Sequence, residues 1–325
     1  MKTEMPLLSV ITPVYNGVDF LEETLQSLVL SDYPNIEFIV VNDGSKDGSG
    51  ELAEKVLSAS GRTYQVINKE NSGEADSDNV ALAASKGSYI AIVNADDPVY
   101  PQLFSKSIAA LEADPKSVTS YPDWDMIDES GKVIRVNYCR DYSLDSLIGD
   151  NICLPGPGAV IRRSAIKSPI LRDPKFRFTS DYRQWLSLSL EGHFLRVPEV
   201  LCTWRIHSAQ QTVQAAGIVQ AKEMISCIED FYSTANLPPK VLSLKAQSFS
   251  QAYYLAAIQS LHRKGVPGRR YLLESLRRVY RRGEGYSPLR REFIVMAMIA
   301  FNPLGRWAVS FAKARTNGFL KRKAR

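Results

Sequence analysis

Ser88-Tyr-Ile-Ala-Ile-Val-Asn-Ala-Asp-Asp-Pro98 is the stretch of sequence that decides the fold. Its apolar, β-branched run from Tyr89 to Val93 is too short for a helix and predicts a buried strand. The run ends in Asn94-Ala95-Asp96-Asp97, and Pro98 cannot extend a hydrogen-bonded ladder. Carboxylates at the end of a buried strand need a positive partner, and a hard cation that carries a diphosphate is one candidate. Alternatively, the same side chains cap a helix that begins near Pro101.

Three earlier segments repeat the order of strand, polar turn and helix. Strands are expected over 7–12, 37–41 and 63–68, and helices over 18–30, 49–60 and 75–86. Strands that alternate with helices through short connections are typical of a parallel, doubly wound α/β sheet. The carboxyl ends of such strands meet at one edge, where ligands bind. The polar turns at 12–15, 42–45, 68–71 and 94–97 should therefore converge, which favours a ligand site over simple capping.

The pattern changes after an expected helix over 102–113. A hairpin around 128–131, a loop over 155–158 before a strand over 159–162, a helix from Asp181 and a strand over 200–204 indicate a mixed α+β half. Beyond about Gln210 the pattern is helical, over 212–234, 240–263, 269–281 and 292–313. The sequence therefore predicts an α/β domain over 1–209 and a helical region over 210–325.

The charge is unevenly divided along the chain. From His262 onward there are 17 Lys and Arg against 3 Glu, whereas the preceding residues hold 23 Lys and Arg against 32 Asp and Glu. Basic residues interleaved with aromatic ones on amphipathic helices suit an anionic membrane surface, although a solvated face or an oligomer contact fits equally well. No motif that reads nucleic acid accompanies the charge, so nucleic-acid binding is not expected.

The four cysteines lack the spacing of a metal site, and reduced thiols are expected. The first residues have no apolar core of a signal peptide, and no stretch reaches the roughly 20 apolar residues of a membrane span. These features predict a cytoplasmic protein, with or without peripheral attachment to the inner face of the membrane.

Seven short segments, taken together, resemble the inverting glycosyltransferases of family 2, which have the GT-A fold. They occur in the family's order within residues 7–210, and the helical tail matches no pattern of the family. The resemblance implies an enzyme of polysaccharide or cell-envelope biosynthesis. It would transfer a sugar from a nucleotide diphosphate sugar, UDP-linked by expectation, to a hydroxyl of a glycan or lipid-linked glycan. The segments are 9–17, 41–48, 73–79, 86–90, 94–97, 180–185 and 204–207.

The resemblance also implies which residues bind the donor nucleotide. An aromatic face can stack on the base, and Asp43 can accept the imide N–H of uracil. The residues at the start of the helix after 73 would meet the ribose or an anion, or else serve as ordinary caps. The implied donor-binding residues are Thr12, Pro13, Tyr15, Asp43, Glu74, Asp76, Asn79, Asn94, Ala95 and Arg205, the last near the phosphates.

The same resemblance implies a cation and a base. Asp96 would bind Mg²⁺ or Mn²⁺ together with His207, although Asn94 stands where the family usually has an acidic residue. Asp181 would deprotonate the acceptor hydroxyl, unless it is the N-cap of its helix. Ser180 stands where the family often has Glu.

Two other functions stay open at this point. A nucleotidyltransferase also places acidic residues and a metal on an α/β sheet, but it needs a Gly-rich, basic phosphate loop that the turn after Thr12 lacks. A non-catalytic module that binds nucleotide sugars is the other alternative, and Asn94 is the one feature that favours it.

Overall fold

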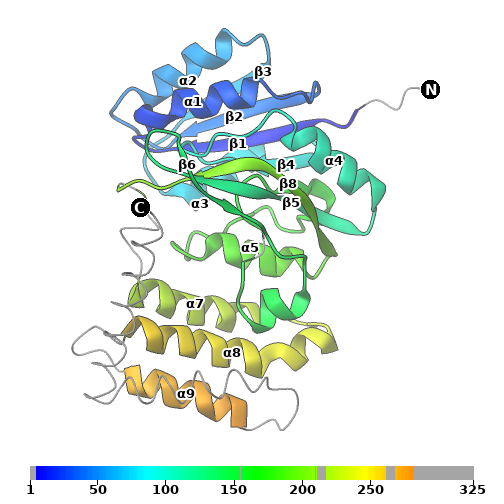
Figure 1. Ribbon diagram of the computed structural model, residues 1–325, viewed down its shortest axis with the longest axis vertical. Helices are drawn as coiled ribbons and strands as arrows, with labels where there is room; N and C mark the ends of the chain where they lie inside the picture. Colours follow the sequence, from blue (N-terminus) through cyan, green and yellow to red (C-terminus); the bar gives the residue numbers. More distant parts are fainter. Residues whose placement is uncertain (1–4, 154, 209, 211–216, 261–267, 281–325) are drawn as a thin grey trace, which may run out of the picture. The chain divides into compact units, whose positions relative to one another are not determined.

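Four parallel strands form the half of the sheet on which the site is built (Figure 1). They are β1 (Leu8–Val14), β2 (Ile36–Asn42), β3 (Thr63–Asn68) and β4 (Tyr89–Ile92), in the spatial order β3-β2-β1-β4. Ile11 of β1 lies opposite Ile39 of β2 and Ile92 of β4. Because all four strands run the same way, their carboxyl ends share one edge. The computed structural model, which describes residues 5–153, 155–208, 210, 217–260 and 268–280, thus confirms the predicted α/β class.

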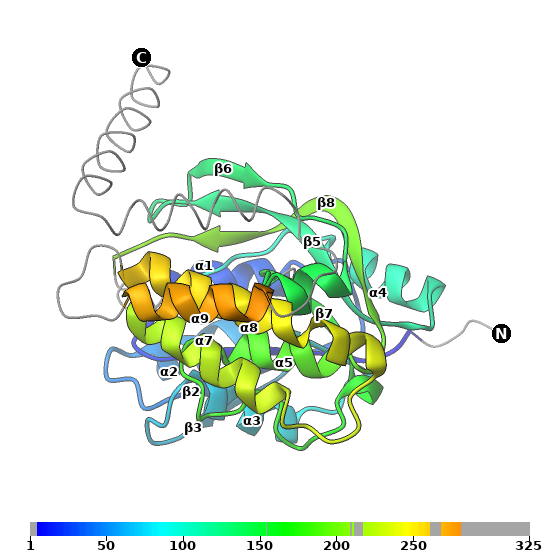
Figure 2. The ribbon, with the colours of Figure 1, turned by 90° about the horizontal axis from the view of Figure 1, so that it is seen from below.

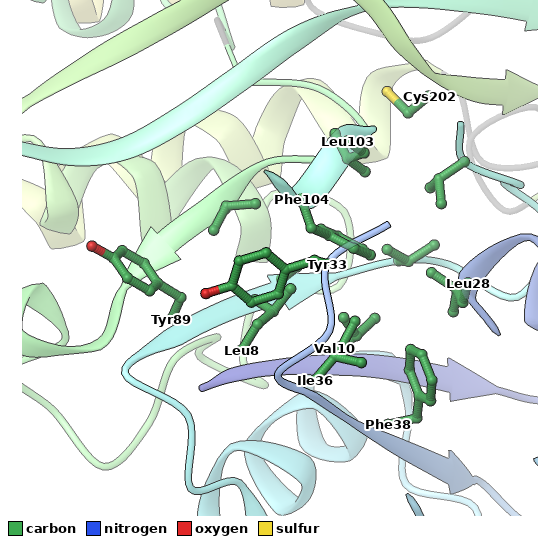
Figure 3. Close-up of a cluster of buried hydrophobic side chains, with 14 of the residues drawn as sticks. Leu8, Val10, Leu28, Tyr33, Ile36, Phe38, Tyr89, Leu103, Phe104 and Cys202 are labelled. Atoms are coloured by element: carbon green, nitrogen blue, oxygen red, sulfur yellow. The ribbon is translucent and has the colours of Figure 1, made fainter. Parts of the chain in front are cut away.

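Helices cover both faces of this half-sheet. Val10 of β1 belongs to an apolar cluster with α1 (Val18–Val29), α2 (Ser49–Ser58) and α4 (Leu103–Ala113), whereas the next residue, Ile11, packs with α3 (Glu74–Ala84). Successive side chains of a strand point to opposite faces, so the two clusters lie on opposite sides of the sheet. Figure 3 shows the first cluster, with Leu28 of α1, Phe38 of β2 and Phe104 of α4 among its members.

The second half of the sheet is mixed, as the sequence predicts. The order continues β4-β7-β5-β6, with β8 paired in parallel to β5. β7 runs antiparallel to both of its neighbours. The elements are β5 (Ser117–Ile127), β6 (Val133–Asn137), a π-turn (Asp145–Gly149), β7 (Val160–Arg162), a 3₁₀ turn (Arg163–Ala165), α5 (Ser180–Leu188) and β8 (His193–Arg205).

β8 is much longer than the strand expected over 200–204. Its first part contains Pro198, which argues against a strand when the sequence is read locally. The structure pairs β8 with β5 along most of its length, with shifts of register near Pro122 and Asp123. This pairing over a long sequence separation extends the strand to Arg205, the residue that enters the site.

A second unit consists of helices. α7 (Ile218–Phe231), α8 (Pro239–Ser260) and α9 (Gly268–Tyr280) pack with α8 in contact with both others (Figures 1 and 2). The chain divides into two compact units, the first made of Met1–Leu147 and Ile152–Gln214 and the second of Ile148–Asn151 and Ala215–Arg325. The sequence predicts one boundary, at 209/210. Asn151 Nδ2 donates to the Ser248 carbonyl (2.9 Å), which ties the short segment to α8.

The helical C-terminal region is therefore confirmed, and the helix predicted over 292–313 lies outside the described residues. Within the described part of the chain, no helix combines the length and the apolar character needed to cross a membrane.

A buried carboxylate aligns the strands at the edge opposite the polar turns. Glu37 Oε1 accepts hydrogen bonds from Ser9 Oγ (2.6 Å) and from the Lys86 N–H (2.6 Å), and Ser9 Oγ accepts one from the Gly87 N–H (2.8 Å). A side chain at Gly87 would place its Cβ 2.5 Å from the Ser9 nitrogen. The entry of β4 is thus fixed to β1 and β2 through one acid that the apolar pattern of 37–41 does not explain.

We predict that Glu37→Ala lowers the free energy of unfolding by about 2–4 kcal/mol, because the buried Ser9 hydroxyl and the part-buried Lys86 N–H both lose their acceptor. Urea unfolding measures this difference without any assay of activity. Glu54→Ala, which removes an acceptor from a surface tyrosine, Tyr64, is the control and should change stability by about 0.5 kcal/mol or less. Equal effects of the two substitutions would contradict the role given to Glu37.

Candidate active site

The turns that follow β1, β2 and β4 meet at the shared edge of the sheet. Ser45 Oγ accepts the N–H of Asn16 (2.9 Å), and Asn16 Oδ1 accepts the N–H of Lys46 (2.9 Å). A Cβ on Gly17 would lie 3.6 Å from the Cβ of Ala95, so the turn after β4 adjoins the turn after β1. The convergence predicted from the sequence is therefore present in the structure.

The residues predicted to hold the base differ in their exposure. Thr12 is buried within β1, and Pro13 is buried beside it. Tyr15, just after the strand, is 57% exposed. Of these three side chains, Tyr15 offers the surface on which a planar ring could stack.

Asp43 is held at the edge by the loop that follows β3. Its Oδ1 accepts the N–H of Ser72 and contacts Lys69 Nζ, and its Oδ2 accepts the N–H of Gly73 (2.9 Å). Burial alone would raise the pKa of Asp43, but the hydrogen bonds from Lys69, Ser72 and Gly73 together hold it below its ordinary value. The carboxylate is therefore ionised at neutral pH.

Lys69 is a member of the site that the sequence analysis missed. Its Nζ contacts Asp43 and the Ser72 hydroxyl and lies 3.4 Å from Asp76 Oδ2. It thereby connects two of the predicted donor-binding residues. The available signal was its place in the polar turn 68–71, but nothing local shows that it faces an acid 26 residues away.

The turn after β4 contains a fully buried acid beside a partly buried one. Asp97 is 2% exposed; it accepts the backbone N–H of Arg205 (2.8 Å) and a hydrogen bond from Asn94 Nδ2 (3.1 Å). Burial, together with the charge of Asp96, raises the pKa of Asp97 well above its usual range. The alternative that these side chains cap the next helix does not describe the structure, because α4 begins at Leu103 without a side-chain cap.

Asp96 and His207 form a pair at the mouth of this turn. His207 Nε2 lies 2.9 Å from Asp96 Oδ2, and the imidazole packs on Phe20 with ring centroids 4.8 Å apart. His207 also lines an open hollow of about 520 Å³, together with Ile206, Ser208 and the hairpin residues 128–130. The pair therefore offers one oxygen and one nitrogen ligand next to free space.

This donor set fits a cation that takes its remaining ligands from a substrate. Within the described residues, no three His, Cys, Asp or Glu side chains gather as a metal cluster. Mg²⁺ and Mn²⁺ are commonly held by one or two protein ligands while phosphate oxygens and water complete the shell. An imidazole ligand suits Mn²⁺ better than Mg²⁺, which prefers oxygen.

Arg205 lies beneath this pair and not beside open space. The sequence predicts Arg205 near the phosphates, but its side chain is fully buried. Nε donates to the Asp96 carbonyl (2.9 Å), and Nη2 donates to Glu23 Oε2 (2.6 Å). Nη1 donates to the carbonyls of Asp128 and Glu129 (3.2 Å each). In this structure Arg205 positions the turn after β4 and presents no exposed surface to a ligand.

Asp181 lies at the beginning of α5 but is not its N-cap. The helix begins at Ser180 after Thr179, and Asp181 Oδ1 accepts the N–H of Tyr182 (2.7 Å). Burial raises the pKa of Asp181, and the positive charge of Arg172 partly opposes this rise. A carboxylate with a raised pKa accepts a proton more readily, as a general base must.

The start of α5 adjoins the start of α3 through Arg172. Arg172 Nη1 lies 2.6 Å from Glu74 Oε1, and Arg172 Nε donates to Gln184 of α5 (3.3 Å). Glu74 directly follows Gly73, whose N–H binds Asp43. Asp181 is therefore on the same edge of the sheet as Asp43. Asn79 has its amide bonded to the backbone of residues 171 and 172.

Comparisons with known proteins find a matching family model and relatives by sequence. The family model described as "Glycosyl transferase family 2" matches residues 9–168. An uncharacterized glycosyltransferase of Rickettsia prowazekii (strain Madrid E) is 31% identical over 230 residues, which cover 67% of this chain and 70% of the relative. The putative teichuronic acid biosynthesis glycosyltransferase TuaG of Bacillus subtilis (strain 168) is 28% identical over 191 residues, 58% of this chain and 73% of TuaG.

Two solved structures have a similar fold at low sequence identity. S. aureus TarS 1–349 in complex with UDP-GlcNAc matches with a TM-score of 0.64 and 18% identity, over 94% of this chain and 87% of that one. A mannosyltransferase from Pyrobaculum calidifontis in complex with GDP-Man and Mn²⁺ matches with a TM-score of 0.61 and 16% identity, over 95% and 84%. These matches concern the fold.

We predict that Asp43→Asn lowers the free energy of unfolding at pH 7 by about 1–3 kcal/mol, because a charged acceptor of two backbone N–H groups is lost. The pKa of Asp43 is lowered in the folded protein, so its contribution is present above the ordinary aspartate pKa and lost as the pH falls below it. The difference between wild type and variant should hold from pH 7 to about pH 5 and shrink below about pH 4. Urea unfolding over this range measures it, and a difference that shrinks near pH 6 would contradict the assignment.

Proposed function

Because the chain belongs to glycosyl transferase family 2, we propose that it transfers a sugar from a UDP-linked donor to a hydroxyl of a glycan or lipid-linked glycan, with inversion. The observation that carries this proposal is the arrangement at one edge of the sheet. The ionised Asp43, the Asp96–His207 pair and the partly buried Asp181 all follow strands or begin helices at that edge. Each has a separate part in the proposed reaction.

Tyr15 and Asp43 would hold the nucleoside. Tyr15 is exposed and able to stack on a base, and Asp43 Oδ2 accepts one N–H, from Gly73, among the described residues. A carboxylate oxygen has two lone pairs, so this atom keeps room for the imide N–H of uracil. The complexes of TarS with UDP and UDP-GlcNAc support a uridine nucleotide as the donor. The mannosyltransferase of similar fold binds GDP-Man, so a guanosine donor is tested as well.

Asp96 and His207 would hold a divalent cation together with the diphosphate of the donor. When bound, the cation supplies positive charge that stabilises the departing nucleoside diphosphate. Arg205 keeps the Asp96 main chain in place through its hydrogen bond to the Asp96 carbonyl. The Mn²⁺ complex of the related fold supports this assignment.

Asp181 would act as the base. Inversion requires the acceptor oxygen to attack the anomeric carbon on the face opposite the leaving phosphate, and a carboxylate removes its proton during the attack. Burial raises the pKa of Asp181 and so strengthens it as a proton acceptor. The proton that leaves the hydroxyl is then held by the Asp181 carboxyl.

The acceptor is proposed to be an envelope polysaccharide or its lipid-linked precursor. The name of TuaG, a teichuronic acid glycosyltransferase, supports this class of acceptor. A lipid-linked acceptor would place the enzyme at the cytoplasmic face of the membrane. The surplus of basic residues after His262 would there meet anionic lipids.

We predict that Asp181→Asn reduces the rate of sugar transfer by about 10²–10⁴-fold, because the amide cannot accept the acceptor's proton. Thermal stabilisation by UDP should persist, since the substituted atom does not bind the nucleoside. A screen of UDP-, GDP- and dTDP-sugars identifies the donor first, and Asp141→Asn, at an acid whose side chain is 89% exposed, is the control. Full activity of Asp181→Asn would remove this residue as the base. A wild type that binds but never turns over any donor would instead indicate a binding module.

We predict that transfer is lost with EDTA and returns with Mn²⁺ or Mg²⁺. Asp96→Asn and His207→Ala should each raise the metal concentration needed for half-maximal activity by about 10–100-fold. They should also weaken the thermal stabilisation by Mn²⁺ with UDP, which needs no turnover. The matched control is His193→Ala, because His193 Nε2 also pairs with an aspartate, Asp114, at 2.7 Å. An unchanged metal requirement in both site variants would contradict the assignment.

A further inference from the structure

A buried arginine connects the start of α3 with the helix that carries the proposed base. From its contacts we infer that Arg172 is a positioning residue for Asp181, and that Asp78 is the counter-charge that determines how much of the positive charge of Arg172 acts on Asp181. This inference rests on the proposed function, because it assigns to Asp181 the role of base. It adds two residues that do not touch the substrate.

The backbone around Arg172 is fixed from α3. Asn79 Oδ1 accepts the N–H groups of Leu171 (2.8 Å) and Arg172 (3.0 Å), and Asn79 Nδ2 donates to the Arg172 carbonyl (2.7 Å). One amide side chain thus holds three backbone groups of two consecutive residues, which lie more than 90 positions away in sequence. The backbone position of Arg172 is therefore fixed by Asn79, independently of the contacts of the Arg172 side chain.

The guanidinium then bridges two helices. Arg172 Nη1 lies 2.6 Å from Glu74 Oε1 and 2.8 Å from Asp78 Oδ2, both on α3. Arg172 Nε donates to Gln184 Oε1 (3.3 Å), and Gln184 is one turn beyond Asp181 on α5. A displacement of Arg172 would be transmitted to the first turn of α5, where Asp181 lies.

Asp78 is an unusual member of this group. It has no exposed surface, and within the described chain neither of its carboxylate oxygens receives an aligned hydrogen bond. Arg172 Nη1 lies within ion-pair distance of Asp78 Oδ2, but its N–H does not point at the carboxylate oxygen. A carboxylate buried in an ion pair is costly to desolvate, and helix packing alone would be served as well by an apolar residue. Such a group calls for an explanation outside stability.

Electrostatics supplies that explanation. Burial raises the pKa of Asp78 to about 7, with Arg172 opposing the rise and Glu74 and Asp181 adding to it. Burial likewise raises the pKa of Asp181, again against Arg172 and with Glu74. Cys153, an exposed residue, also interacts electrostatically with Asp181 and Arg172. The positive charge of Arg172 therefore acts on three acids, Glu74, Asp78 and Asp181, which also interact with one another.

The direction of the coupling follows from the charges. While Asp78 holds a proton, Arg172 acts more fully on Asp181 and lowers its pKa. When Asp78 ionises near neutral pH, its negative charge offsets Arg172, and Asp181 becomes the stronger proton acceptor. Removal of the Asp78 charge should therefore lower the pKa of Asp181, and removal of the Arg172 charge should raise it.

The test is the pH profile of kcat/KM for sugar transfer. Asp78→Asn should move the acid limb to lower pH and Arg172→Gln should move it to higher pH, each by about one unit, as expected for interacting sites. Arg172→Lys keeps the positive charge, so its acid limb should lie much closer to that of the wild type than the acid limb of Arg172→Gln does. Glu74→Gln should move it in the same direction as Asp78→Asn but by less, because Glu74 is 48% exposed. General destabilisation cannot shift the limb in opposite directions.

A matched control exists in the same unit. Arg196 Nη2 pairs with Asp123 Oδ2 at 2.7 Å, and Asp123 is buried to a similar degree as Asp78. Asp123→Asn should lower the melting temperature and leave the pH profile unmoved. If Asp78→Asn and Arg172→Gln behave like this control, or shift the limb in the same direction, the inference is overturned and the group is structural only.

A second measurement separates this inference from the proposed function. Carbon-13 NMR titration of labelled aspartate carboxyls in the full chain follows Asp181 and Asp78 without substrate. In Asp78→Asn, a titration near pH 7 should disappear and that of Asp181 should move to lower pH. Coupling seen by NMR in a protein that transfers no sugar would mean that the proposed function has failed. Turnover with an uncoupled Asp181 would mean that only this inference has failed.

Discussion

The site depends on a guanidinium that has no contact with solvent. A fully buried arginine needs oxygen atoms for its N–H groups, since leaving them unpaired would cost several kilocalories per mole, on the order of 3–5. Arg205 receives these oxygens from the turn after β4, from the β5–β6 hairpin and from Glu23 of α1, and it packs over the ring of Phe20 at 4.8 Å. Three segments far apart in sequence are thereby brought to one point. His207, two residues beyond Arg205, consequently meets Asp96.

The aspartates around this point differ in charge because their partners differ. Asp43 has Lys69 and two backbone N–H groups, which keep its pKa low. Asp97 is enclosed beside Asp96 and has a raised pKa, and Asp181 is raised by burial against the charge of Arg172. The same type of side chain is thus an anionic hydrogen-bond acceptor in one place and, in the proposed reaction, a proton acceptor in another. Environment, not residue type, separates these roles.

Local sequence predicts the parts of the structure that local chemistry determines. The strand over 63–68 is found at the predicted residues. The turns after β1, β2 and β4 could be predicted to form a ligand site because the carboxyl ends of parallel strands share one edge. Three features could not be predicted in this way: the burial of Arg205, the pairing of Lys69 with Asp43, and the group around Arg172. Each depends on a contact between residues that are 26 to 182 positions apart, and no periodic pattern records such a pairing. Asp78 lay between two selected residues, Asp76 and Asn79, but its burial appears only in the folded chain.

Asn94 illustrates how a departure from a family pattern can be consistent with the site. Its Nδ2 donates a hydrogen bond to Asp97 Oδ2, which a carboxylate at the same position could do only when protonated. Asp97 is buried and already raised in pKa by burial and by Asp96. A third acid at position 94 would repel the carboxylates of Asp96 and Asp97, whereas the Asn94 amide donates a hydrogen bond to Asp97. In the proposed metal site, the negative charge that faces the cation would therefore lie on Asp96, and His207 would matter correspondingly more as its second ligand.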